Sequence, residues 1–234
     1  MKLVKSAGAR SVRMLSGRAG DLRSTLDRMV IDSDDVAANS VLTSLGGGSG
    51  DAGARSVTDT LHALGLNRSL VRRPYIIEDD RRPLSIRTDR APALFTNFIT
   101  TPYELARLMV AIHRGAVGRG GVARLGIGVR AARAELLARL LDVRDRSKLV
   151  AGVPPSVPVA HKTGYTEQVK HDGGIVYLRS GPVVAAAMTW SASGVGDATG
   201  DRFIAEVARA ARHRLGNGGV CQGLPLSPGR RGAR

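Results

Sequence analysis

The sequence predicts an α+β fold, in which a mainly helical subdomain is followed by an antiparallel sheet and a flanking helix. Three observations support it: apolar residues recur at helical spacing within residues 21–150, strand-like runs follow, and residues 159–215 end in an amphipathic helix. Helices and strands segregated along a chain are typical of this class. We expect one domain over residues 21–215, an irregular basic segment before it (1–20) and a disordered tail after it (216–234).

Three helices are expected first. One spans Asp21 to Ile31, and the next begins with Ser33 or Asp34 as its N-cap and ends at the glycines from Gly46 onward. The Ser49-Gly50 pair looks like a flexible link before a third helix, which Gly65 ends. The apolar positions that define the three helices are Leu22, Leu26, Met29, Val30, Val36, Val41, Leu42, Leu45, Val57, Leu61 and Leu64.

Residues 67–99 then form a long irregular segment, and a segment of this length inside a domain is usually functional. A strong helix start follows, because Thr101 is a good N-cap, Pro102 suits the first turn and Glu104 occupies the capping-box position. We expect this helix to end at Gly115.

The remaining elements are one more helix and the sheet. The helix covers roughly Ala131 to Leu141. Val159 to Val169 is expected to be one strand, and a hairpin should join residues 174–179 to Val183–Trp190. A final helix carries Phe203, Ile204, Val207 and Ala211.

Composition excludes some classes of protein. With 43% hydrophobic residues the chain is globular, and no stretch reaches the ~18 apolar residues of a membrane span. The net charge of +15 could indicate a nucleic-acid binder, but the arginines are scattered and no basic block contains aromatic residues. An arginine-rich surface is therefore favoured, and no nucleic-acid partner is expected.

Cysteine and histidine give no sign of a metal site or cofactor. Cys221 is the only cysteine, which excludes an internal disulfide and a cysteine-based metal cage. The five histidines show no ligand spacing, and His161 and His171 are expected at the surface or at the rim of a cleft. We expect no metal and no cofactor.

The most informative motif is His161-Lys162-Thr163-Gly164, which lies on a predicted strand. Lys162 offers a fixed cation for a carboxylate, and Thr163 adds a hydroxyl donor. Gly164 has no side chain, so a substrate could lie along the strand edge. The alternative interpretation of this motif is an ordinary strand edge without a function. The hairpin and the amphipathic helix that follow the motif in the sequence favour a functional site.

The second motif is Ser33-Asp34-Asp35, followed by Asn39. An ordinary N-cap with acidic residues in the first turn would explain its first three residues. It would not explain why the motif precedes a Lys-Thr-Gly strand at domain distance.

Together the two motifs resemble the signature of class A β-lactamases and penicillin-recognising serine hydrolases. The resemblance covers about Asp21 to Leu215. It implies a serine β-lactamase/transpeptidase-like fold, whose sheet also includes N-terminal strands. The implied roles are proton relay for Ser33, oxyanion binding for the Tyr165 N–H, substrate binding for Lys162, Thr163, Gly164 and Asp35, and bracing of a loop for Asn39.

The chain departs from the family pattern in three ways. No serine is followed by a lysine three positions later, so the family's nucleophile motif is missing. Asp35 stands where the family has Asn, and an ionised carboxylate can only accept hydrogen bonds. The segment 85–99 contains no Glu to activate water. We expect an N-terminally truncated chain that lacks the first strands and the nucleophile helix and has marginal stability.

Three functions are therefore considered. The first is a β-lactamase-like serine hydrolase, inactive as this chain alone, and the second is a non-catalytic binder of a carboxylate ligand or cell-wall peptide. The third, less favoured, is a basic nucleic-acid-associated protein. The first two predict a monomer whose partner is a small-molecule or peptide substrate with a carboxylate. The family is usually secreted or periplasmic, yet residues 1–23 show no signal peptide, so the compartment is undetermined.

Overall fold

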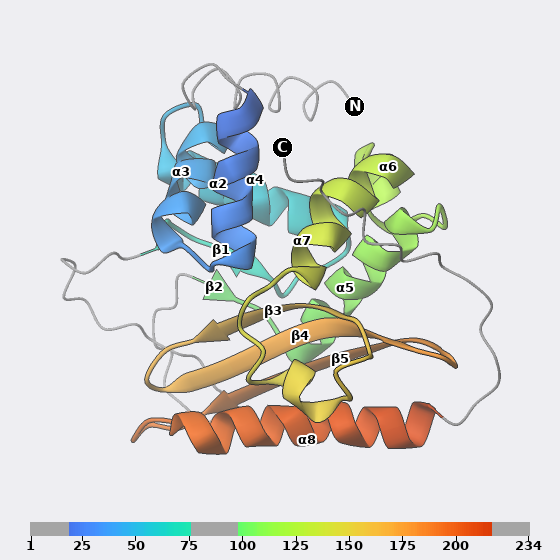
Figure 1. Cartoon of the computed structure of the whole chain (residues 1–234). Coiled ribbons are helices and arrows are strands. Elements are labelled where there is room, and N and C mark those ends of the chain that lie inside the picture. The colour runs from blue at the N-terminus through green and yellow to red at the C-terminus, as the bar shows by residue number, and fades with distance from the viewer. Residues whose placement is uncertain (1–18, 76–97, 217–234) are drawn as a thin grey trace, which may run out of the picture.

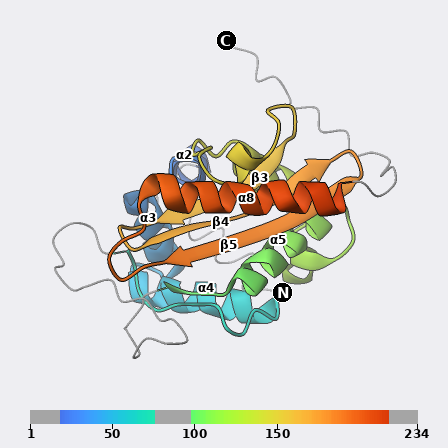
Figure 2. The same ribbon diagram turned by 90° about the horizontal axis from the view of Figure 1, so that it is seen from below.

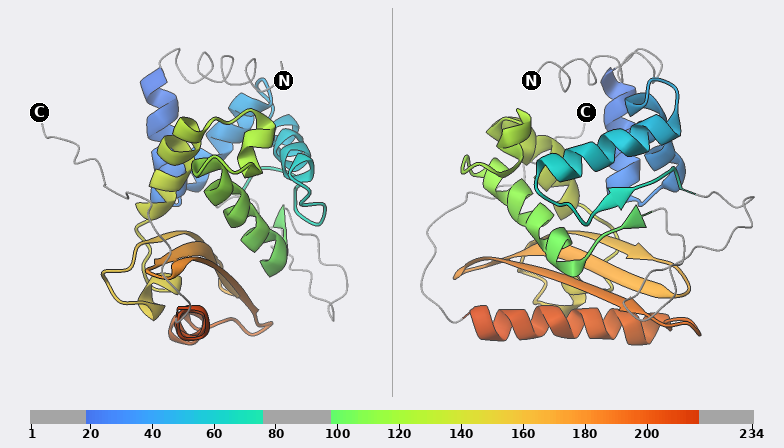
Figure 3. Two further views of the ribbon diagram at one scale, coloured as in Figure 1. Left: turned by 90° about the vertical axis from the view of Figure 1, so that its right-hand side faces the viewer. Right: turned by 180° about the vertical axis from the view of Figure 1, so that it is seen from behind.

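Three antiparallel strands form the base of the molecule, in the order β3 (Val159–Tyr165), β4 (Val169–Leu178) and β5 (Gly181–Trp190). The structure is a computed structural model that describes residues 19–75 and 98–216. Helix α8 (Asp197–Leu215) lies across one face of the sheet, as Figure 2 shows. Helix α5 (Pro102–Ala116) packs on the opposite face (Figure 3).

A helical layer stands above the face of the sheet that α5 covers (Figure 1). A short two-stranded ladder joins its segments, and 3-10 and π turns interrupt the later helices. Its elements are α2 (Ala19–Ile31), α3 (Asp35–Leu45), α4 (Gly50–Ala63), β1 (Leu70–Val71), β2 (Phe98–Ile99), η1 (Gly121–Leu125), α6 (Val129–Ala131), η2 (Ala132–Leu137) and α7 (Ala138–Leu141), and η3 (Leu149–Gly152) leads to the sheet. The expected α+β fold is confirmed.

Helix starts follow the side chains that can cap them. Asp34 caps α3 by accepting the Ala37 N–H at 2.9 Å. Ser49 caps α4 by accepting the Ala52 N–H at 3.3 Å, so the expected flexible link is wrong and α4 begins at Gly50. The reason is close packing of α3 on α4: a Cβ on Gly53 would lie 1.8 Å from the Leu42 carbonyl oxygen.

The capping box expected at α5 is only half formed. Thr101 accepts the Glu104 N–H at 3.1 Å, as predicted. The Glu104 carboxylate does not reach back to Thr101; it is 5% exposed and accepts the Arg68 N–H at 3.0 Å and the Ser69 hydroxyl at 2.6 Å. Burial of this carboxylate ties the strand pair β1–β2 to α5. Helix α5 also continues one residue beyond Gly115.

The expected strand from Val159 to Val169 is wrong, because the chain reverses within it. The Thr166 N–H donates to the Val169 carbonyl at 3.0 Å, and the Thr166 hydroxyl accepts the Gln168 N–H at 3.2 Å. Strand β4 therefore starts at Val169, five residues earlier than expected. Position 173 of β4 has room only for glycine, because the Leu105 side chain packs against it. A Cβ placed on Gly173 would lie 2.5 Å from Cδ2 of Leu105.

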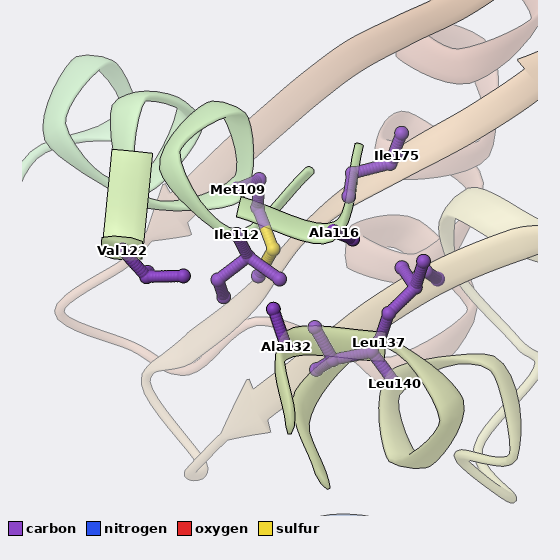
Figure 4. Close-up of a cluster of buried hydrophobic side chains, with 9 residues drawn as sticks. Met109, Ile112, Ala116, Val122, Ala132, Leu137, Leu140 and Ile175 are labelled. Carbon is purple, nitrogen blue, oxygen red and sulfur yellow. The ribbon is translucent and has the colours of Figure 1, made fainter. Parts of the chain in front are cut away.

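The two faces of the sheet are buried by separate hydrophobic clusters. The first lies between α5, η2, α7 and the sheet, and Figure 4 shows its side chains pointing toward one another. It contains Met109, Ile112, Ala116, Val122, Ala132, Leu137, Leu140, Ala160 and Ile175. The second lies between α8, η3 and the other face, and contains Leu149, Val150, Val153, Val159, Val176, Ala185, Ala187, Ile204 and Ala208.

Helix α8 buries a narrower face than the sequence indicated. Ile204 and Ala208 are completely buried, whereas Phe203 is 51% exposed although it was expected on the apolar side. Val36 of α3 is likewise 52% exposed. Within residues 19–75 and 98–216, no helix combines the length and apolar character that crossing a membrane requires.

The contrast between Ile204 and Phe203 gives a first test. We expect Ile204→Ala to lower the free energy of unfolding by about 2–5 kcal/mol, because it leaves a cavity in the second cluster. Phe203→Ala, the neighbouring control, should change it by less than about 0.5 kcal/mol. Urea unfolding followed by circular dichroism measures both, and equal effects would contradict the described packing of α8.

Candidate functional site

The two sequence motifs meet where β3 lies beneath the α2–α3 connection. The Lys162 ammonium donates to the Ser33 hydroxyl across 2.7 Å, although the two residues are 129 positions apart in the sequence. Ala160 packs with the α5 cluster and Val159 with the α8 cluster. Because side chains alternate along a strand, Lys162 points toward the helical layer, where Ser33 is.

The environment of Lys162 weakens its hold on its proton. Burial lowers the pKa of the Lys162 ammonium, and the carboxylates of Asp172, Asp145 and Asp35 oppose this shift only in part. The ammonium also donates to the Thr163 carbonyl at 2.9 Å. A half-buried lysine with a lowered pKa and a hydroxyl at hydrogen-bond distance can exchange a proton with that hydroxyl.

Ser33 is held in a strained backbone conformation. Its φ is +60°, and it is the one residue other than glycine with a positive φ in the described part of the chain. Such a conformation costs roughly 1–3 kcal/mol unless the surroundings fix it. Asp34 provides the fixation: its N–H donates to the Arg28 carbonyl at 3.1 Å, and its carboxylate accepts from the Arg28 guanidinium at 2.6 Å.

Asp35 begins α3 beside this connection and is exposed. Partial desolvation raises the pKa of the Asp35 carboxyl, the charge of Asp34 raises it further, and Lys162 opposes both. The pKa of Asp34 is instead lowered, first by the Ala37 N–H and then by Arg28. The two neighbouring carboxyl groups therefore differ: Asp34 is committed to structure, while Asp35 is accessible to a ligand.

The outer edge of β3 carries the remaining predicted residues. The Thr166 N–H and the Pro158 carbonyl both bond to β4, so the even-numbered residues of β3 face β4. The backbone groups of Thr163 and Tyr165 therefore point to the outer edge, where the Tyr165 N–H is directed away from β4. A Cβ added to Gly164 would point to the same face of β3 as Lys162 and would meet no atom of the described residues within 4 Å, so there is open space over the strand on that face.

The Thr163 side chain is less accessible than the sequence suggested. It lies on the opposite face of β3 from Lys162 and is 5% exposed.

Asn39 links α3 to the segment that follows β1. Its side-chain amide donates to the Tyr75 carbonyl at 3.0 Å, and its amide oxygen accepts the Tyr75 N–H at 2.7 Å. The Tyr75 ring stacks on Phe98 with 4.3 Å between ring centroids. The segment 85–99, in which the sequence analysis looked for a Glu, lies mostly outside the described residues.

Sequence reasoning missed an ionic cluster around Tyr165. The Tyr165 ring is 63% exposed and lies 5.4 Å from the Lys148 ammonium and 4.9 Å from the Lys170 ammonium. Lys148 pairs with Asp145 at 2.7 Å, and Lys170 pairs with Asp197. A sequence signal existed: in this arginine-rich chain, the three lysines beyond residue 5 are Lys148, Lys162 and Lys170. All three lie at this end of β3.

His161 was expected at a cleft rim, and this is wrong. It is completely buried, and its Nδ1 lies 3.1 Å from a carboxylate oxygen of Asp172, also completely buried. Asp172 accepts the Leu149 N–H at 3.0 Å as well. The pair joins β3, β4 and η3 on the reverse side of the strand from Lys162, and so fixes the strand that carries the lysine.

The arrangement suits recognition of an anionic acyl compound. The Lys162 ammonium and the Ser33 hydroxyl lie on the helical face of β3, and the Tyr165 N–H points outward three residues further along the strand, so together they could hold a carboxylate and a carbonyl oxygen. In the part of the chain that the structure describes, no group of three His, Cys, Asp or Glu side chains could hold a metal ion.

Comparisons with known proteins identify a family and a shared fold. A family model described as "Beta-lactamase enzyme family" matches residues 3–215. Among curated proteins, none matches the chain significantly.

Several solved structures share the fold. A mutant of PBP-A, solved as an acyl-enzyme complex with penicillin G, is 24% identical with a TM-score of 0.61, over 82% of this chain and 60% of that one. A beta-lactamase from Desulfarculus baarsii is 24% identical with a TM-score of 0.62, over 83% of this chain and 64% of that one. A beta-lactamase from Streptosporangium roseum is 21% identical with a TM-score of 0.62, over 83% and 65%. The chain thus spans 60–65% of the length of these structures.

The lowered pKa of Lys162 predicts a specific pH dependence. Between its folded pKa and its usual value of 10.5, the unfolded chain binds more protons, so stability rises with pH in that window. Lys162→Met removes this pH-dependent contribution to the free energy of unfolding. The unfolding free energy of the variant minus that of the wild type should therefore fall as the pH rises from about 7 to about 10.

Lys148→Met is the matched control. Burial alone would lower the pKa of Lys148, but Asp145 and Asp201 outweigh it and raise the pKa. Its contribution is therefore fully present below the unfolded pKa, and this variant should be less stable than the wild type by a constant amount over the same range. Urea titrations at several pH values measure both, and a pH-independent difference for Lys162→Met would contradict the burial of its charge.

Asn39→Ala should release the Tyr75 backbone. The Tyr75 N–H loses its acceptor, and we expect its hydrogen exchange to accelerate on the order of tenfold. Ser40→Ala is the control, because the Ser40 hydroxyl bonds only within α3, to the Val36 carbonyl. Hydrogen exchange resolved by mass spectrometry distinguishes the two, and equal protection in both variants would refute the bracing contact.

Proposed function

Because this chain belongs to the beta-lactamase enzyme family, we propose that its β3 edge serves a β-lactamase-like serine hydrolase that opens a β-lactam or another amide through an acyl-enzyme. The observation that carries this proposal is the 2.7 Å bond between Lys162 and Ser33. It brings together a carboxylate-binding cation and a hydroxyl that can pass on a proton. The penicillin G acyl-enzyme of PBP-A, a protein of the same fold, supports β-lactams as the ligand class.

Each residue has a role that its position allows. Lys162 attracts the substrate carboxylate, and the Thr163 hydroxyl adds a hydrogen bond from the other face of the strand. The outward N–H of Tyr165 donates to the carbonyl oxygen as negative charge develops there. The open space beside Gly164 gives the substrate room to lie along β3 as an added strand.

Ser33 passes a proton to the leaving nitrogen. When the amide C–N bond breaks, the nitrogen takes the proton of the Ser33 hydroxyl, and Ser33 takes one from the Lys162 ammonium. The lowered pKa of Lys162 makes this transfer less costly. The strained backbone of Ser33 keeps the hydroxyl aimed at Lys162 before the substrate arrives.

Asp35 selects among substrates. An ionised carboxylate accepts hydrogen bonds and repels a carbonyl oxygen, so it favours a substrate with an N–H group on the side of Asp35. Its raised pKa makes protonation easier as the pH falls, and the protonated carboxyl would add a donor.

A second function has its own supporting observation. In the printed sequence, no serine is followed three positions later by a lysine, the motif that supplies the nucleophile in this family. The binding residues alone would make a receptor that holds a carboxylate ligand, such as the end of a cell-wall peptide, without forming an acyl bond. Both proposals use the same residues, so one ligand can test them.

We expect the chain to bind penicillin G, and Lys162→Ala to weaken that binding at least about tenfold through loss of a charged hydrogen bond. Arg209→Ala is the control, since it also removes one positive charge, but from an exposed ion pair with Glu206 on α8. Isothermal titration at fixed low salt measures both. Equal weakening in both variants would show that general charge attraction, and not the cleft, accounts for binding.

Intact-protein mass after denaturation separates the two functions. A mass increase equal to the ligand shows an acyl bond and supports the hydrolase. Binding without a mass increase is the result that a chain lacking the Ser-x-x-Lys motif predicts, and it restricts this chain by itself to the receptor function. Absence of any binding by the wild type contradicts both.

A further inference from the structure

Tyr165 carries an exposed aromatic ring beside the candidate binding residues. Its side chain is 63% exposed. Aromatic residues make up only 3% of the chain, so an exposed one at the end of the binding strand stands out from the rest of the surface. The role proposed above uses the Tyr165 N–H and leaves the ring without one. Rigid aromatic side chains are common anchors for ligands, so the ring is a candidate contact in its own right.

Two nearly buried ammonium groups hold the ring in place. The Lys148 nitrogen lies 5.4 Å and the Lys170 nitrogen 4.9 Å from the ring centroid. Lys170 is also the cross-strand partner of Tyr165 in the ladder between β3 and β4. A cation near the face of an aromatic ring attracts it. The ring is thus positioned before a ligand binds, which lowers the entropic cost of using it as a contact surface.

The lysines are themselves fixed by carboxylates. The Lys148 ammonium donates to Asp145 at 2.7 Å and lies 3.3 Å from Asp201 of α8. Lys170 pairs with Asp197, the first residue of α8. The two lysines are only 3% and 6% exposed, whereas the ring beside them is 63% exposed. Covering the lysines therefore uses only part of the surface of the ring.

The position of the ring along β3 shows which part of a ligand it meets. Side chains two residues apart point to the same face of a strand, about 7 Å apart, so the Tyr165 ring follows the Thr163 hydroxyl on one face. In the proposed function Thr163 bonds to the substrate carboxylate, and the Tyr165 N–H bonds to the carbonyl oxygen. A substituent carried next to the carboxylate can therefore reach the ring.

We propose that the Tyr165 ring is a specificity-determining contact that stacks on a flat, conjugated group carried next to the substrate carboxylate. This role rests on the proposed function, since it assumes the same ligand position. Flat groups stack on aromatic rings with a gain beyond that of the buried area alone. Among β-lactams, cephalosporins carry a substituent on the carbon next to the one that bears the carboxylate, whereas penicillins have two methyl groups there. Cephalosporins with a conjugated substituent are thus the preferred ligand class.

A matched pair of ligands tests the ring. Cephalothin and nitrocefin share the fused β-lactam ring, the carboxylate and the thienylacetyl side chain. They differ in the substituent next to the carboxylate, which is acetoxymethyl in cephalothin and a flat dinitrostyryl group in nitrocefin. Both have one negative charge, so the net charge of +15 attracts them equally. We expect the chain to bind nitrocefin about tenfold more tightly than cephalothin in isothermal titration at fixed low salt.

Variants of Tyr165 separate the ring from the backbone. Tyr165→Ala keeps the N–H and removes the ring, so it should abolish the preference for nitrocefin and leave the binding of cephalothin unchanged. Tyr165→Phe keeps the ring and should keep the preference. Tyr165→Leu keeps apolar bulk without a flat face and should lose most of the preference, so the test does not depend on the Ala variant folding normally. Circular dichroism checks the fold of each variant.

Tyr103→Ala is the matched control. Tyr103 is 72% exposed, and its ring also lies near a cation, 5.8 Å from the Arg107 guanidinium. It belongs to α5, which carries none of the proposed binding residues. This variant should keep the preference for nitrocefin.

The outcomes separate this role of the ring from the proposed function. If the wild type binds neither ligand, the proposed function fails and the role of the ring fails with it. If the wild type binds both ligands equally, or if Tyr165→Ala weakens both by the same factor, the chain binds carboxylates but the ring does not select among them. The role of the ring alone is then overturned. Loss of the preference in Tyr103→Ala as well as in Tyr165→Ala would also overturn it.

Discussion

The hydrogen bond between Lys162 and Ser33 is the interaction on which the candidate site depends. It joins the helical layer to a sheet strand, with 2.7 Å between the Lys162 nitrogen and the Ser33 oxygen. Other contacts hold each of the two residues in place. The Ser33 backbone is held at φ +60° by the contacts of Asp34 with Arg28. The strand that carries Lys162 is held by the buried pair of His161 and Asp172 on its other face. Rigid support of this kind keeps a polar site formed before a ligand binds.

Alternation along β3 divides its residues between structure and function. One face carries His161 into the interior, and the other sends Lys162 toward the helices. The backbone adds a second alternation, because even-numbered residues bond to β4 and odd-numbered ones face the open edge. The Lys162 ammonium is directed by the alternation of side chains and the Tyr165 N–H by the alternation of backbone groups. The two can therefore act on the same ligand. A ligand that adds itself as a strand would complete this edge.

The two outer strands of the sheet differ in the charged side chains near their edges. At β3, Lys148 and Lys170 lie beside the Tyr165 ring and pair with Asp145 and Asp197, so this end of the strand is polar and suits a small anionic ligand. No residue of β5 is charged. The row of unpaired N–H and C=O groups at the β3 edge suits ligand recognition, because charged side chains lie beside it.

Local sequence patterns determined most of the helices, the cap at Thr101, a cap at Ser33 or Asp34, the existence of the hairpin and the strand position of Lys162, because these depend on residues within a few positions of one another. The family pattern indicated Ser33 and Lys162 as residues of one site. Only the tertiary structure decided that the chain reverses at Thr166, that His161 is buried against Asp172, and that Lys148 and Lys170 lie beside the Tyr165 ring. Each of these depends on how β3, β4, η3 and α8 pack together. A short-range pattern cannot specify which distant side chain will fill the space beside a strand.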